Sequence, residues 1–153
     1  MKKLELKIAP PILVAIIMLL MWGVANFTSN YNIVFGNRYI VIFIAVFLGM
    51  SFMASAVIKF TMIKTTINPM KPENATSLVT SGLYRFSRNP IYLADLLFIF
   101  AWGLYLSNPF SLVFCIIFIL YMNRFQITPE ERFLEEKFGN EFLAYKQKVR
   151  RWI

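Results

Sequence analysis

The 153-residue sequence has no histidine and only one cysteine, Cys115. Histidine is the commonest general base and a frequent metal ligand, and cysteine is the other usual ligand of zinc sites. A single cysteine also cannot form a disulfide within the chain. We therefore expect no metal, and any reaction of this protein has to proceed without an imidazole.

Acidic residues are also scarce: the chain has 8 Asp and Glu against 16 Lys and Arg, for a formal net charge of +8. An excess of basic residues can indicate a nucleic-acid partner, so their placement has to decide. All of them except Arg38 fall before residue 8, in residues 59–88 or after residue 123. Because cytoplasmic segments of membrane proteins are enriched in Lys and Arg, this distribution predicts a multi-pass protein of the cytoplasmic (inner) membrane. Both termini would be cytoplasmic, membrane lipids would surround the chain, and no nucleic acid would bind.

Apolar residues make up 58% of the chain and aromatic residues 17%, as is typical of integral membrane proteins. A bilayer core requires ~20 apolar residues per helix. We expect an all-α polytopic protein with about four transmembrane helices, the last two forming a tight hairpin, in a single domain over residues 1–153. The first span is too long for the core of a signal peptide and is expected to be a retained anchor. The predicted spans are 10–27, 39–58, 91–107 and 109–125, with a cytoplasmic loop at 59–89 and a cytoplasmic tail at 126–153.

The dipeptide Asn-Pro occurs twice, at residues 89–90 and 108–109, each time at the start of a predicted span. Asn is a favoured N-cap and Pro fits the first helical position. Capping chemistry alone therefore explains both dipeptides. It does not explain the polar residues that cluster around the first one: Tyr84, Arg85, Arg88 and Tyr92.

The tail contains the pattern of two short helices. Thr128 can be an N-cap, Pro129 fits the first helical position, and Glu131 completes a capping box, so we expect a helix to begin there and to end at Gly139. A second helix would be amphipathic and basic, and it would lie on the membrane surface or fold over a cytoplasmic pocket. Its apolar residues recur every three or four positions: Phe142, Tyr145, Val149 and Trp152.

Three acidic residues lie at or near predicted membrane boundaries. Glu130 and Glu131 fall in the first turn of the tail helix, where the macrodipole favours acids, but their position beside the membrane also suits a cationic ligand. Asp95 lies inside a predicted span, where acids are functional candidates. It is also only about one helical turn beyond Pro90 and could reach the interface, so both interpretations of Asp95 are kept.

Two linked motifs carry a family resemblance: LVTSGLYRFSRNPIYL at 78–93 and EERFLEEKFGNEFLAYKQKVRRWI at 130–153. Together they resemble the isoprenylcysteine carboxyl methyltransferase family and its phospholipid methyltransferase relatives. That pattern is a Leu-Val-x-x-Gly-x-Tyr run, then Arg-His-Pro-x-Tyr, a membrane hairpin, Glu-Glu and Phe-Gly. The match covers about the C-terminal half of the chain, and two linked motifs are more specific than either alone. The sequence departs from the pattern at Asn89, where His is usual, and at Phe142, where Tyr is frequent.

The resemblance implies a membrane-embedded methyltransferase that uses S-adenosylmethionine, with cytoplasmic helices covering the cofactor pocket. It also implies a lipid-soluble methyl acceptor, such as an isoprenylcysteine-like carboxylate. Arg124 or Gln126 would face the acceptor, and Arg124 and Glu131 are the catalytic candidates. The residues expected to hold the cofactor are Thr76, Ser77, Leu78, Val79, Tyr84, Asn89, Pro90, Ile91, Tyr92, Glu130 and Glu131.

The chemistry of the residues is compatible with this interpretation. Methyl transfer from a sulfonium is an in-line displacement, so positioning is the main contribution of the protein. A carboxylate or thiolate acceptor needs no strong base, which suits a chain without histidine. Tyr84, Tyr92 and the glutamate pair can hold a cation through cation–π contacts and charge. Asn89 can donate and accept hydrogen bonds but cannot titrate, so it would contact the cofactor without transferring a proton.

Three alternatives are kept. A phospholipid amine as acceptor would require deprotonation, and the sequence offers no obvious base. A small membrane scaffold or transporter subunit would use the caps and the basic helix structurally, and its polar clusters would tolerate conservative substitution. A reductase is the third alternative, because membrane sterol reductases look similar in their C-terminal part, but the sequence shows no specific nicotinamide site.

Overall fold

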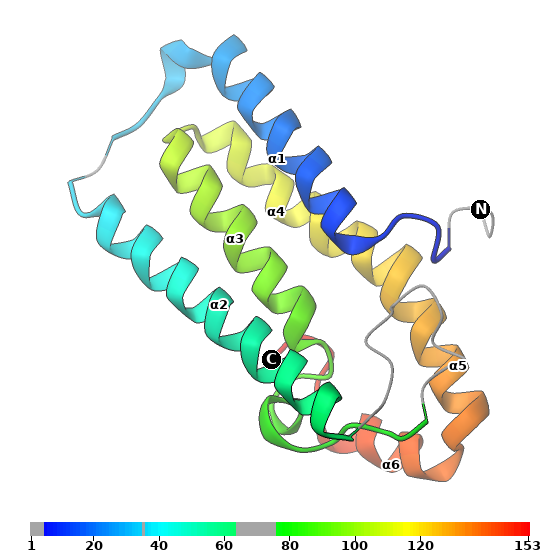
Figure 1. Cartoon of the computed structure of the whole chain (residues 1–153). Coiled ribbons are helices and arrows are strands. Elements are labelled where there is room, and N and C mark those ends of the chain that lie inside the picture. The colour runs from blue at the N-terminus through cyan, green and yellow to red at the C-terminus, as the bar shows by residue number, and fades with distance from the viewer. Residues whose placement is uncertain (1–4, 35, 64–75) are drawn as a thin grey trace.

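The chain is a bundle of long helices with two shorter helices at one end (Figure 1). The computed structural model describes residues 5–34, 36–63 and 76–153, and no strand occurs among them. The middle of the predicted loop, 64–75, lies outside the described residues. The α-helices are α1 (Pro10–Phe27), α2 (Arg38–Ile63), α3 (Pro90–Leu106), α4 (Pro109–Tyr121), α5 (Thr128–Phe138) and α6 (Asn140–Lys148).

In the part of the chain that the structure describes, three helices are long and apolar enough to cross a membrane: α1, α2 and the continuous helix Pro109–Phe138 that contains α4 and α5. Their outer faces expose large apolar side chains such as Leu19, Phe43 and Ile116, as expected of a surface in contact with lipid. Across residues 5–34, 36–63 and 76–153, the prediction of a helical protein with apolar helices suited to a membrane is therefore confirmed. α3 is apolar but has only 17 residues, so the fourth span stays a prediction.

α3 lies at the centre of the bundle and packs against α1, α2 and α4 (Figure 1). Two glycines permit close approach: a Cβ on Gly103 would lie 2.6 Å from Leu112 Cδ2, and a Cβ on Gly49 would lie 2.8 Å from Phe98 Cε1. One apolar cluster joins α1, α3 and α4 and fixes their arrangement. Its buried members are Leu13, Ile17, Met21, Tyr92, Ile99, Phe118, Met122 and Ile127.

We call the region around the turn between α3 and α4 the turn end of the bundle. Here Asn108 caps α4, because its Oδ1 accepts hydrogen bonds from the backbone N–H of Phe110 (3.0 Å) and Ser111 (3.2 Å). Its Nδ2 donates to Thr28 Oγ1 at 2.8 Å and to Asn32 Oδ1 at 2.9 Å. One buried amide therefore both starts α4 and ties the end of α1 to the hairpin.

α5 begins at Thr128 as predicted, but the predicted N-cap is wrong, because α4 continues into α5 through the π-helical segment Met122–Ile127. Thr128 has helical angles (φ −62°, ψ −43°), and its Oγ1 donates to the carbonyl of Asn123 at 2.6 Å instead of capping. A π-helical turn is wider than an α-helical one, which gives the ring of Pro129 room inside a continuous helix. Gly139 ends α5 as predicted, with φ at 50°.

Candidate active site

We call the opposite end of the bundle, formed by residues 76–92 and 124–153, the site end. Here α6 folds over the segment that precedes α3, and Tyr145 Oη donates to the carbonyl of Tyr84 at 2.7 Å. Burial raises the pKa of Tyr84, so its hydroxyl stays protonated. The second tail helix therefore folds over the segment that precedes α3. The buried cluster beneath α6 consists of Ala56, Val79, Tyr84, Phe142, Tyr145 and Val149.

The turn before α3 holds the C-terminal tail by backbone and side-chain hydrogen bonds. Arg88 N donates to the carbonyl of Arg150 at 3.0 Å, and Arg88 Nη1 donates to the carbonyl of Val149 at 2.7 Å. Asn89 Nδ2 donates to the carbonyl of Arg151 at 2.9 Å and makes no capping hydrogen bond to α3. Capping is therefore the wrong explanation for the side chain of Asn89, although Pro90 does occupy the first turn of α3.

Glu131 is a buried carboxylate neutralised by two arginines. Arg88 Nη2 donates to its Oε1 at 2.7 Å, and Arg151 Nη2 donates to its Oε2 at 2.5 Å. Arg151 Nε adds a contact to Oε1 at 3.2 Å. Burial alone would raise the pKa of Glu131, but the hydrogen bonds from Arg151 and Arg88 outweigh it, and the pKa lies below its usual value. Glu131 therefore links the turn before α3, the tail and α5.

The neighbouring Glu130 has a different environment. Its Oε1 accepts hydrogen bonds from Tyr92 Oη at 2.5 Å and from Gln126 Nε2 at 2.6 Å, both uncharged donors. Burial raises the pKa of Glu130 to about 7, and the two hydrogen bonds offset only part of that effect. Adjacent carboxylates with pKa values shifted in opposite directions are a frequent sign of a functional site.

The residues of the segment 76–79 lie at the site end with differing exposure. Val79 is buried in the cluster beneath α6, whereas Thr76 is exposed. Ser77 Oγ is buried and has no hydrogen-bond partner among the described residues. Since buried hydroxyls are normally paired, Ser77 is a candidate contact for a polar ligand.

Arg124, predicted as catalytic, forms an ion pair with Glu5 of the N-terminal segment. Its Nη1 lies 2.9 Å from Glu5 Oε1, and Arg132 pairs with the other oxygen of Glu5. Leu6 N also donates to the carbonyl of Phe125 at 3.0 Å. Sequence reasoning missed this role of Glu5 and the pairing of Arg151 with Glu131. No local sequence pattern could have revealed these ion pairs, because the paired residues are far apart along the chain.

Asp95 is buried in α3, with 6% of its surface exposed. Its place three residues beyond Tyr92 puts it one turn deeper in the bundle than the Tyr92–Glu130 pair. Both interpretations of Asp95 are kept.

A comparison with known families assigns the chain to one of them. A model of the phospholipid methyltransferase family matches residues 37–141. The chain belongs to the phospholipid methyltransferase family. The expected family is thereby confirmed, and with it a methyltransferase as the class of enzyme.

Relatives in this family include proteins with and without an assigned activity. An uncharacterized protein of Haemophilus influenzae is 54% identical over 63 residues, which is 41% of this chain and all of that protein. The protein-S-isoprenylcysteine O-methyltransferase of Saccharomyces cerevisiae is 40% identical over 82 residues, 52% of this chain and 33% of its own length. A probable protein-S-isoprenylcysteine O-methyltransferase of Oryza sativa subsp. indica is 39% identical over 80 residues, 50% of this chain and 40% of its own. The chain thus spans well under half the length of the two named methyltransferases.

Proposed function

We propose that this protein transfers a methyl group from S-adenosylmethionine to a lipophilic acceptor at the membrane surface. The observation that carries the proposal is the difference between the two adjacent carboxylates. Glu131 is saturated by two arginines, whereas Glu130 is held by neutral donors and keeps its negative charge uncompensated when ionised. A cationic ligand would supply the missing counter-charge.

The residues at the site end suit such a cofactor. S-adenosylmethionine, when bound, supplies a methyl group on a positively charged sulfur. Glu130 would attract the cation, Tyr92 would orient the carboxylate, and Ser77 Oγ would gain the hydrogen bond that it lacks. Arg88 and Arg151 would keep Glu131 fixed and so maintain the shape of the site. In this arrangement Glu131 acts by positioning.

The distribution of charge supports one orientation of the bundle. We propose that α1, α2, α3 and α4 all span the cytoplasmic membrane, with the site end in the cytoplasm. The basic residues of α5, α6 and the tail lie at that end, whereas Arg38 lies at the turn end. α3 is slightly short of the ~20 residues of a typical span, and its position at the centre of the bundle shields its ends from lipid. A soluble cofactor would then meet a lipid-soluble acceptor at one surface.

We favour a carboxylate as the methyl acceptor, of the kind that an isoprenylcysteine presents. A carboxylate attacks without losing a proton, which suits a site without histidine. An amine acceptor, such as a phospholipid head group, is the second candidate. The raised pKa of Glu130 supports it, because a carboxylate with a pKa of about 7 can accept a proton near neutral pH.

The test begins with calorimetric titration of the detergent-solubilised protein with S-adenosylhomocysteine. Saturable binding is expected, and its absence from a folded sample would favour the scaffold alternative. Membranes supplied with methyl-labelled S-adenosylmethionine then identify the acceptor. Base-labile label in methyl esters is expected, whereas stable label in phospholipid head groups would favour the amine.

A further inference from the structure

Two residues that precede α1, Glu5 and Leu6, contact the π-helical segment Met122–Ile127 and α5 (Figure 1). Leu6 N donates to the carbonyl of Phe125 at 3.0 Å. In an α-helix that carbonyl would accept from the residue four positions later, but this residue is Pro129, which has no N–H. Leu6 supplies the missing donor from a left-handed conformation, with φ at 55°. A residue with a branched side chain keeps such a conformation only when its surroundings hold it there.

Glu5 bridges the two sides of the junction between the π-helical segment and α5. Its Oε1 lies 2.9 Å from Arg124 Nη1, and its Oε2 pairs with Arg132. Arg124 lies in the π-helical segment, and Arg132 lies on α5. A π-helical turn closes i→i+5 hydrogen bonds, so it changes the rotation of every later residue relative to the helix before it. One carboxylate that binds on both sides therefore favours a single register of α5 relative to α4.

The stretch between the two arginines contains the carboxylate that has no charged partner in the site. Gln126 Nε2 donates to Glu130 Oε1 at 2.6 Å, and Tyr92 Oη donates to the same oxygen from α3. Gln126 belongs to the π-helical segment and Glu130 to α5, so their hydrogen bond crosses the junction that Glu5 bridges. A change of register would move one of these two side chains relative to the other.

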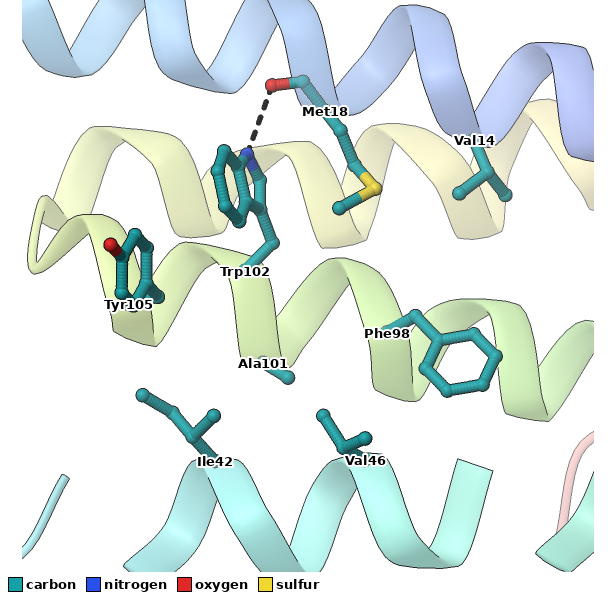
Figure 2. A pocket seen from close by; sticks show the side chains of 8 residues that line it. All are labelled: Val14, Met18, Ile42, Val46, Phe98, Ala101, Trp102 and Tyr105. Atoms are coloured by element: carbon teal, nitrogen blue, oxygen red, sulfur yellow. Dashed lines mark hydrogen bonds between the residues drawn. The ribbon is translucent and has the colours of Figure 1, made fainter. Parts of the chain in front are cut away.

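The residues before α1 are themselves held through α1. They lead directly into this helix, which is bound to α3 by a hydrogen bond between side chain and backbone. Trp102 Nε1 of α3 donates to the carbonyl of Met18 of α1 at 3.0 Å, drawn as a dashed line in Figure 2. The contacts of Glu5 and Leu6 therefore connect the π-helical segment to a helix that α3 holds in place.

We propose that Glu5 and Leu6, which we call the N-terminal brace, position Gln126 against Glu130 and so set the affinity of the site for its cationic ligand. Glu5 is a positioning residue, because it acts through Arg124 and Arg132 and the helix that carries them. This inference rests on the proposed function of the site end, with S-adenosylmethionine as the ligand.

The test is titration of the whole chain in detergent with S-adenosylmethionine at several pH values. Glu5→Gln removes the charge of Glu5 and keeps its size. Glu135→Gln is the matched control, because Glu135 is on α5 and its pair with Lys146 is exposed on both sides. Should Glu5→Gln fail to fold, Arg132→Gln breaks the same bridge from the other side and leaves the pair of Arg124 with Glu5. Denaturant unfolding shows whether each variant is folded.

We expect Glu5→Gln to weaken S-adenosylmethionine binding about fivefold, a coupling of the usual size for residues of one contact network. The control should bind like the wild type. Positioning also predicts a change in the pH dependence. Burial raises the pKa of Glu130 to about 7, whereas the hydrogen bonds from Tyr92 and Gln126 act to lower it. Losing the bond from Gln126 raises this pKa further, so the increase of affinity with pH should move to higher pH in Glu5→Gln.

Three results have distinct meanings. Wild-type affinity in a folded Glu5→Gln protein would overturn the inference. A weaker affinity with an unchanged pH dependence would also overturn it, because Glu5 would then act elsewhere than on the contact between Gln126 and Glu130. Failure of the folded wild type to bind S-adenosylmethionine at any pH would instead reject the proposed function.

Discussion

The dipeptide Asn-Pro opens both α3 and α4, yet the two asparagines do different things. At the turn end, Asn108 caps α4 and ties the hairpin to the end of α1. At the site end, Asn89 leaves α3 without a side-chain cap and binds the carbonyl of Arg151 in the tail. The dipeptide is the same, but the turn end uses its asparagine to start a helix and the site end uses it to hold a distant segment.

The surroundings explain the difference. Around Asn108, all the partners of its side chain are neutral groups, and its amide oxygen and nitrogen are both hydrogen-bonded. Around Asn89, the tail runs back along the turn before α3 and brings Arg151 to Glu131. We infer that the contacts of the turn end stabilise the fold. At the site end, Asn89 binds the tail instead of capping α3, and we infer that this contact helps to form a ligand site.

The largest effect on stability is expected at the site end, from Glu131→Ala. This substitution leaves Arg88, whose side chain is only 10% exposed, without its carboxylate. Removing one partner of a buried ion pair costs about 3–5 kcal/mol, and the greater exposure of Arg151 places the expected loss near the lower figure. Denaturant unfolding in detergent measures the change.

Glu135→Ala is the matched control, because Glu135 is on the same helix and its pair with Lys146 is exposed on both sides. Exposed pairs contribute about 0–1 kcal/mol. Equal losses for the two variants would mean that the Glu131 network does not organise the site end.

The next largest effect is expected from alanine at the two asparagines. Asn108→Ala removes a helix cap and leaves buried groups unpaired, so we expect a loss of about 2 kcal/mol with unchanged affinity for S-adenosylhomocysteine. Asn89→Ala should cost about 1 kcal/mol but weaken S-adenosylhomocysteine binding, because the tail loses a tether. Reversal of this pattern would contradict the division between the two ends.

A smaller effect is expected from pH. Glu130 has a pKa of about 7, and only its ionised form attracts a cation. The affinity for S-adenosylmethionine should therefore rise several-fold from about pH 6 to about pH 8, and it should be flat over this range in Glu130→Gln. A wild-type affinity that does not change, or that falls, as pH rises would show that Glu130 is not the group that meets the cation.

Local sequence patterns predicted much of the helical fold. Proline and glycine at helix ends located the starts of α3 and α4 and the end of α5, because these signals act within one turn. The N-cap predicted at Thr128 failed for the same reason: a local cap signal cannot reveal that a π-helical segment joins this helix to the one before it. The end of α2 at Ile63, beyond the predicted span, shows that hydropathy marks the apolar part of a helix and not its length.

The site was predictable in its residue types but not in its pairings. The motifs pointed to Tyr92 and the two glutamates, and the structure brings Tyr92 to Glu130. They could not separate the roles of Glu130 and Glu131, because that difference depends on Arg151, twenty residues away along the chain from Glu131. Glu5 was missed for a similar reason: it meets Arg124 and Arg132 only after the bundle has folded.

The most direct test of the account is titration of Glu130→Gln with S-adenosylmethionine, beside Glu136→Gln as control. At about pH 8, where Glu130 with its pKa of about 7 is mostly ionised, both changes remove one charge from α5, but Glu136 is exposed to solvent. The account predicts at least a tenfold loss of affinity in Glu130→Gln, about 1.4 kcal/mol, with the unfolding midpoint preserved and wild-type affinity in Glu136→Gln. Unchanged affinity in a folded Glu130→Gln protein would contradict the claim that the Glu130 carboxylate binds the positively charged ligand.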